Sequence, residues 1–317
     1  MPHKKIVILG TGGTIAGVAA NAADSLGYTA AQIGVEQLVK ALPRQGDELF
    51  DLVTEQVAQL DSKDMDFSVW RHLASRVGHW LGQSDVQGIV ITHGTDTLEE
   101  TAWFLQTLLN PVKPVVLTCA MRPATALVPD GPQNMVDAIS VAMQAGARGT
   151  VAVCAGVIHG AADVQKTHNY RLDAFSSGDG GPLGYVEEGR VRLLRDWPHL
   201  VANPLASGLK NRVELPESAS WPRVEVVMNY AGASAAVVEA LVANGVDGLV
   251  VAGTGNGTLH HKLEMALLEA QAKGVRVVRA TRCLNGHVMP KPGDLLPDSE
   301  GLSPVKARVS LLLSLMS

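Results

Sequence analysis

The chain has 317 residues, and at roughly 150 residues per domain this length suggests about two domains. Apolar residues make up 46% of the sequence and charged residues 18%, a balance that indicates a large core and excludes a disordered chain. The net charge is −5 and no basic stripe is visible, so nucleic acid is not an expected partner. No apolar run reaches the roughly 18 residues of a membrane-spanning helix, so we expect no membrane partner.

Short apolar runs rich in valine and isoleucine alternate with helical patterns along the chain. The runs predict strands over 5–9, 88–92, 115–119, 150–154, 224–228, 248–252 and 276–280. The helical patterns predict helices over 64–81, 98–109, 132–145, 233–244, 259–273 and 304–316. This alternation predicts an α/β fold, in which a larger N-terminal domain has a mainly parallel sheet flanked by helices. A linker and a smaller C-terminal α/β domain follow.

Local signals mark the helix starts and the domain boundary. Thr97 and Glu100 form a capping box, while Asp64 and Ser303 stand as caps at two other helix starts. Segment 187–222 contains four prolines and breaks the strand–helix rhythm. We therefore expect an N-terminal domain over 1–200, a linker over 201–221 and a C-terminal domain over 222–317.

The cysteines and the N-terminus bear on the compartment. Cys119, Cys154 and Cys283 lie far apart and are odd in number, which indicates neither a disulfide framework nor a metal site. No zinc spacing joins them to the histidines. The apolar stretch 6–9 is too short for the core of a signal peptide. We expect three buried thiols in a cytoplasmic protein, with no metal site.

A glycine turn follows the first predicted strand and leads to Thr14. A dinucleotide-binding G-x-G-x-x-G pattern from Gly10 would need glycine at Ile15, and a later glycine turn fails in the same way at Thr258. No G-x-x-x-x-G-K-S/T pattern occurs, so a P-loop is excluded. Two interpretations remain: the turn presents the Thr14 hydroxyl for chemistry, or Thr14 merely caps a helix.

The second predicted strand ends in another polar turn, which holds Thr95 and Asp96. These side chains meet a helix N-terminus, where unpaired backbone N–H groups favour developing negative charge. Capping accounts for Thr97 but leaves Thr95 and Asp96 without a role. Two more polar segments are 61–65, before a helix, and 163–167, which holds Lys166. A lysine that reaches a hydroxyl in a partly dry site can act as a base.

In these segments the chain resembles the bacterial L-asparaginases of the asparaginase/glutaminase type. Segments 11–15 and 93–97 look like the paired signatures of that family. Similar blocks occur at 27–39, 120–123, 130–132, 181–185, 255–257 and 304–308, so that the resemblance covers nearly the whole chain. Two signatures in the right order, together with these blocks, are highly specific.

The resemblance implies roles for the polar residues. Thr14 would be the nucleophile on a mobile loop, with Tyr28 beside it. Thr95, Asp96 and Lys166 would form a second hydroxyl–acid–base group across the substrate, with the logic of a catalytic triad but without histidine.

The resemblance also implies the substrate contacts. Ser62 and Asp96 would hold the α-substituents of an amino acid, and backbone N–H groups near Gly13 and Gly94 would form the oxyanion hole. The Ala120 carbonyl would receive the leaving amide. The remaining contact is Asn256, which would reach the site from a neighbouring subunit.

The function implied is hydrolysis of L-asparagine to L-aspartate and ammonia, without a cofactor, in a homotetramer built as a dimer of dimers. The partner is then a small amino-acid substrate, and glutamine stays open as a second one. An amidotransferase subunit of a related type should carry an extra domain before the first signature, which here begins at residue 11. A small amino-acid binding protein would need no hydroxyls and lysine around its pocket. A dinucleotide-dependent oxidoreductase is disfavoured by both glycine turns.

Two positions depart from the family pattern. Many secreted relatives place glutamine or glutamate after the serine to meet the substrate's amino group, whereas this chain has Lys63. The acidic residue that other members place after the last strand is not plainly present within 286–298. Asp61 can supply negative charge instead, as in the Asp–Ser pair of the cytoplasmic branch. We expect Lys63 to turn away from the substrate and to pair with Asp64 or Asp66.

Overall fold

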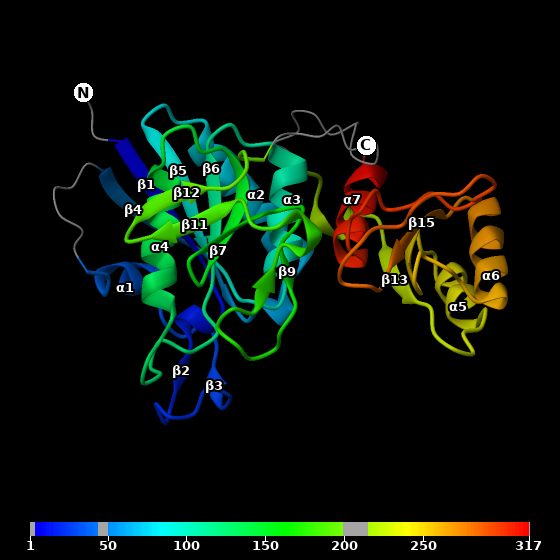
Figure 1. Cartoon of the computed structure of the whole chain (residues 1–317), viewed down its shortest axis with the longest axis horizontal. Coiled ribbons are helices and arrows are strands. Elements are labelled where there is room, and N and C mark those ends of the chain that lie inside the picture. The colour runs from blue at the N-terminus through cyan, green and yellow to red at the C-terminus, as the bar shows by residue number, and fades with distance from the viewer. Residues whose placement is uncertain (1–3, 44–49, 199–214, 317) are drawn as a thin grey trace. The chain divides into compact units, whose positions relative to one another are not determined.

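The computed structural model describes residues 4–43, 50–198 and 215–316, and these form two compact units (Figure 1). The first unit holds the described residues up to 198 together with Leu215, and the second unit holds residues 216–316. Most of the predicted linker, 201–214, lies outside the described residues. The predicted boundaries at 200 and 222 therefore stay predictions.

The first unit is built on an eight-stranded sheet with the order β12–β11–β8–β7–β6–β5–β1–β4 among the described residues. Strands β4, β1, β5, β6 and β7 run parallel, and β8, β11 and β12 extend the sheet in antiparallel fashion. The bounds are β1 (Lys4–Gly12), β4 (Phe50–Leu60), β5 (Val86–Thr92), β6 (Pro114–Thr118), β7 (Gly149–Cys154), β8 (Val157–Gly160), β11 (Gly184–Glu187) and β12 (Arg190–Leu193). The predicted α/β fold with a mainly parallel sheet is confirmed.

Helices cover both faces of this sheet (Figure 1). Alternate β1 residues such as Ile6 and Ile8 pack in one buried cluster with α1 (Val35–Lys40) and α4 (Gly131–Met143). The opposite face packs against α2 (Phe67–Leu81) and α3 (Leu98–Leu109), which are joined by Trp70 stacked on Phe104 at 4.7 Å between ring centroids. Burial on both faces explains why the central strands are continuously apolar.

The carboxyl ends of the central strands are level with one another. Gly10 of β1 lies opposite Thr92 of β5, and Thr92 lies opposite Thr118 of β6. The loops that follow these strands and β4 therefore meet at one edge of the sheet, where ligands bind in α/β proteins. The short elements in the loops of this unit are η1 (Thr14–Ala16), β2 (Val18–Ala19), β3 (Tyr28–Thr29), η2 (Ser62–Asp64), β9 (Gln165–Lys166), β10 (Phe175–Ser176) and η3 (Gly178–Gly180).

The second unit has a three-stranded parallel sheet in the order β13–β14–β15 within the described residues. Helices α5 and α6 share a buried cluster with one face of the sheet, while α7 also contacts all three strands. The bounds are η5 (Ser218–Ser220), β13 (Val224–Met228), α5 (Ala236–Ala243), β14 (Gly248–Gly253), α6 (His261–Ala272), β15 (Arg276–Thr281) and α7 (Pro304–Leu315). Of the helices in the described part of the chain, none is both long and apolar enough to cross a bilayer.

Several local predictions were wrong. Helix α2 begins at Phe67 with Asp66 as its cap, because Asp64 belongs to the preceding turn η2. Thr97 does precede α3, but no capping box forms, since its hydroxyl donates to the carbonyl of Ser62 at 2.9 Å. Ser303 likewise makes no side-chain capping bond.

The cysteines also differ from expectation. Cys119 and Cys154 are buried side by side, with their sulfurs 3.1 Å apart, whereas Cys283 is exposed. The contact with Cys154, together with burial, raises the pKa of the Cys119 thiol well above its usual value. The Cys119 thiol is thus held in the unreactive protonated form.

Candidate active site

Two glycine turns meet at the carboxyl edge of the sheet. Gly13 follows β1 with φ of +82°, and a Cβ atom placed on it would lie 2.4 Å from both N and Cα of Gly94. A Cβ on Gly94 would in turn lie 2.4 Å from the hydroxyl oxygen of Ser62. Only glycine fits at either position, so three loops that follow three different strands are brought into direct contact.

Thr14 follows the first of these glycines and is paired with Tyr28. The Thr14 hydroxyl lies 2.7 Å from the Tyr28 hydroxyl, and the threonine is only 7% exposed. Tyr28 comes from β3, which pairs with β2 in a hairpin that projects from the sheet edge in Figure 1. The structure thus brings together two residues that the family resemblance predicted to lie beside each other.

Thr95, Asp96 and Lys166 form the second hydroxyl group. The Lys166 ammonium donates to the Thr95 hydroxyl at 2.7 Å and to Asp96 Oδ1 at 2.6 Å. Lys166 lies on the two-residue strand β9, and its own backbone N–H donates to Glu99 Oε1 at 3.3 Å. Its side chain is 18% exposed while that of Asp96 is 52% exposed, so the open side of the carboxylate faces solvent. A cation, a carboxylate and a hydroxyl are therefore held in contact beside the glycine turns.

Ser62 lies in the turn η2 directly after β4 and is buried. Its hydroxyl accepts the backbone N–H of Asp96 at 3.2 Å, and its carbonyl accepts the Thr97 hydroxyl. Asp61 caps this turn by accepting the N–H of Lys63 at 3.4 Å. These bonds fix the Ser62 loop against the Thr95 loop.

Ala120 stands just after β6 and is buried. The loop behind it is held by the Asp130 carboxylate, which accepts the N–H groups of Met121 and Arg122, both at 2.9 Å. The carbonyl of Cys119, the residue before Ala120, accepts from the Asn134 side-chain amide at 2.9 Å. Four adjacent strand ends thus each contribute a predicted site residue.

A buried chain of hydrogen bonds through His93, here termed the relay, lies behind the site. It was not predicted from the sequence, although His93 lies inside the second signature. His93 Nδ1 lies 2.7 Å from the Gly94 carbonyl, which can only accept, so Nδ1 carries the hydrogen. Its Nε2 then accepts from the Thr101 hydroxyl at 3.0 Å, and that hydroxyl accepts from Trp70 at 2.9 Å. Burial lowers the pKa of His93 to about 4, so the ring stays neutral and holds the Gly94–Thr95 peptide in place.

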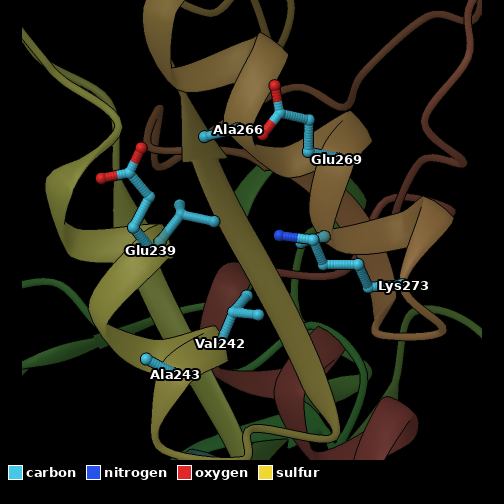
Figure 2. A pocket seen from close by; sticks show the side chains of 8 residues that line it. Glu239, Val242, Ala243, Ala266, Glu269 and Lys273 are labelled. Carbon is cyan, nitrogen blue, oxygen red and sulfur yellow. The ribbon is translucent and has the colours of Figure 1, made fainter.

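Asn256 belongs to the second unit. Its amide donates to the Met289 carbonyl at 2.9 Å and accepts the Met289 N–H at 2.7 Å, which fixes the turn between β14 and α6. A hollow in the same unit lies between α5 and α6 (Figure 2). Glu239, Glu269 and Lys273 surround an apolar floor there, without a hydroxyl nucleophile, so it lacks the groups for acyl transfer. Within the described residues, no group of three or more His, Cys, Asp or Glu side chains could hold a metal ion.

Comparison with known proteins decides the family. Residues 5–199 match the model described as Asparaginase, N-terminal, and residues 223–317 match the Glutaminase/Asparaginase C-terminal domain. The chain belongs to the asparaginase family. It is an amidohydrolase of that family, and the predicted resemblance is confirmed.

Individual relatives of this asparaginase-family protein align over almost its full length. L-asparaginase 2 of Bacillus subtilis (strain 168) is 38% identical over 98% of this chain and 82% of that protein. The glutaminase-asparaginase of Pseudomonas fluorescens biotype A is 36% identical over 98% of this chain and 86% of that protein. The crystal structure of the probable cytoplasmic L-asparaginase from Campylobacter jejuni matches with a TM-score of 0.89 at 38% identity, covering 98% of this chain and 95% of that one.

Lys63 is the main departure of this asparaginase-family chain, and it pairs with Asp64 as predicted. Asp61 is also within reach at 3.9 Å, whereas Asp66 is engaged in capping α2. The hydrogen bond with Asp64 raises the pKa of Lys63, so the side chain stays a cation. It is 61% exposed and reaches solvent.

Replacing Lys63 with glutamine is expected to leave KM unchanged or lower it, and to leave kcat nearly intact. An ammonium at 4 Å from the substrate's own ammonium would cost on the order of 1–4 kcal/mol, so a lysine at this position has to turn away. Steady-state kinetics with asparagine measure this, with Lys40→Gln as a control on an exposed lysine that is paired with Glu36. A rise in KM beyond about tenfold, or 1.4 kcal/mol, would make Lys63 a substrate ligand.

Proposed function

We propose that the protein hydrolyses the side-chain amide of L-asparagine to L-aspartate and ammonia, with Thr14 as the nucleophile. One observation carries the proposal: Thr14 and Thr95 follow neighbouring strands whose loops touch at Gly13 and Gly94. Thr14 is paired with Tyr28, while Lys166 contacts both Thr95 and Asp96. An amide hydrolase needs a hydroxyl nucleophile, a base and donors for the developing oxyanion, and we assign these roles to the groups at this edge.

The reaction then runs in two steps. The Thr14 oxygen forms a bond to the amide carbon while the C–N bond breaks, and the hydroxyl proton leaves with the nitrogen as ammonia. Water next adds to the resulting ester, the C–O bond to Thr14 breaks, and aspartate and the free hydroxyl are formed. In its neutral amine form, Lys166 is the base that takes a proton through the Thr95 hydroxyl, which it contacts at 2.7 Å, and Asp96 orients Lys166.

Substrate recognition follows from the remaining groups. The half-exposed Asp96 carboxylate attracts the α-ammonium, and the Ser62 hydroxyl holds the α-carboxylate. The Gly13 N–H already donates to the Leu60 carbonyl at 2.9 Å, so other backbone N–H groups near Gly13 and Gly94 would face the oxyanion. The Ala120 carbonyl would accept from the leaving amide. Asp61 adds negative charge to the ammonium side, where relatives use the residue after the serine.

Glutamine is the second candidate substrate, since relatives named glutaminase-asparaginase are 34–36% identical to this chain. A pure binding protein is not favoured, because it would not need Lys166 held against a buried hydroxyl.

Ammonia release with asparagine and with glutamine, compared side by side, tests the proposal. Asparagine is expected to be turned over, and Thr14→Val should abolish the signal. Tight binding of asparagine without ammonia release would instead favour the binding protein.

We further propose that the chain works as a homotetramer in the cytoplasm, with a catalytic domain over 1–200, a linker over 201–221 and a C-terminal domain over 222–317. Support for the compartment comes from the solved relative titled a probable cytoplasmic L-asparaginase, although one relative is named a probable periplasmic L-asparaginase. Cell fractionation checks the compartment.

Light scattering is expected to give the mass of a tetramer, because the turn that holds Asn256 has to come from a neighbouring subunit to complete a site. Dilution that separates the subunits should lower turnover per chain. A fully active monomer would contradict shared sites, and Asn256→Ala should then have no effect on KM.

A further inference from the structure

The loop over residues 121–130, here termed the bracket loop, is closed on itself. At its base, Asp130 accepts the two backbone N–H groups of Met121 and Arg122. Across its middle, the Arg122 guanidinium donates to the Val128 carbonyl at 3.1 Å. These bonds brace the bracket loop from within.

The segment that rests against it is the flap, residues 17–29, which includes β2 and β3. The flap has little apolar anchoring of its own: Leu26 is 77% exposed and Val18 is 36% exposed. The β2–β3 hairpin consists of only two residue pairs. A segment with so few buried contacts opens readily unless polar contacts hold it.

Hydrogen bonds from the bracket loop supply those contacts. The N–H of Ala124 donates to the Gly17 carbonyl at 3.0 Å, and the N–H of Leu127 donates to the Ala22 carbonyl at 3.1 Å. Between them, the Thr125 hydroxyl accepts the N–H of Ala19 at 2.8 Å and lies 3.4 Å from the Ala19 carbonyl. Thr125 thus contacts the backbone N–H and carbonyl of Ala19 in β2, as a neighbouring strand would.

We propose that Thr125 is a positioning residue that latches the flap in the closed position. It touches no reacting group, and it acts through Ala19 on the hairpin that holds Tyr28 against Thr14. The effect on turnover rests on the proposed function, whereas the effect on flap opening does not. Because Thr125 is exposed, its replacement leaves the core intact.

The test compares Thr125→Val, which keeps the shape but removes the hydroxyl, with Thr125→Ser, which keeps the hydroxyl. Thr107→Val is the matched control, since the Thr107 hydroxyl is buried without a hydrogen-bond partner in the described structure. Hydrogen exchange of peptides from 17–29 is measured with and without aspartate, alongside kcat and KM for asparagine. Aspartate is expected to protect the flap in the unmodified protein.

Thr125→Val should speed exchange of the flap at least threefold and lower kcat/KM roughly three- to tenfold, mainly through KM, because one exposed hydrogen-bonding site is lost. Thr125→Ser and Thr107→Val should both stay within twofold of the unmodified protein. Unchanged flap exchange in Thr125→Val, or faster exchange spread over the whole first unit, would overturn the latch. If the unmodified protein released no ammonia, the proposed function would fail while the exchange comparison still tested the latch.

Discussion

Replacing Thr14 with valine is expected to lower kcat on the order of 10⁴-fold or more, because it removes the atom that forms the covalent bond with substrate. Valine has nearly the same shape as threonine, and Thr14 is buried, so the fold should be retained. The Tyr28 phenol would lose its partner, which is a small cost beside the loss of the nucleophile. Ammonia release measured with saturating asparagine gives the change.

Thr14→Ser is the matched control, since it restores a hydroxyl at the same position, and it should recover a large part of the activity. Thermal unfolding of both variants shows whether the fold survives. Mass spectrometry adds a second criterion: the aspartyl ester should accumulate in Thr95→Val and be absent in Thr14→Val. An ester found in Thr14→Val would move the nucleophile to another residue.

Replacing Lys166 with methionine is the second change with a large expected effect, a fall in kcat of roughly 10²–10⁴-fold. The Thr95 hydroxyl would lose its base, and the Asp96 carboxylate would lose its only described ion partner. Since Lys166 and Thr95 act as one unit, the double variant with Thr95→Val should be little worse than either single variant. Steady-state kinetics of the four proteins measure this coupling.

Lys113→Met is the control for removing a partly buried lysine. The Lys113 ammonium donates to the carbonyls of Leu81 and Gln83, away from the carboxyl edge of the sheet, so kcat should hardly change. Strictly additive losses in the Lys166 and Thr95 pair would separate the two residues into different steps. A kcat within tenfold of the unmodified value in Lys166→Met would remove the lysine from the proton transfer.

The sequence predicted the central strands because their burial leaves a clear pattern, and it missed β4 for the opposite reason. As an edge strand, β4 keeps Asp51 and Glu55 in its sequence and leaves Leu52 43% exposed, so no continuous apolar run marks it. The antiparallel strand β12 was hidden in the irregular segment in the same way, with a mostly exposed run of Arg190–Leu193.

The candidate site shows a similar division. Thr14 and Thr95 were predictable as polar residues at strand ends, since parallel strands end at a common edge. Ser62 follows the missed strand β4, so its place in the site came from the family resemblance. Lys166 required the family resemblance, because no local pattern announces the two-residue strand β9 that positions it. The relay through His93 depends on side chains from two helices, and therefore has no signature in the chain order.

The contact between Gly13 and Gly94 has a consequence for folding. Nearby, the Thr11 hydroxyl donates to the Thr92 carbonyl across a sequence separation of 81 residues, so both contacts require β1 to be seated beside β5. Pairings over such separations form late, because the entropy of closing the intervening chain has to be overcome first. A nascent or refolding chain would therefore contain several native helices before it contained any catalytic geometry, and recovery of activity would report the closing of the central strand pair.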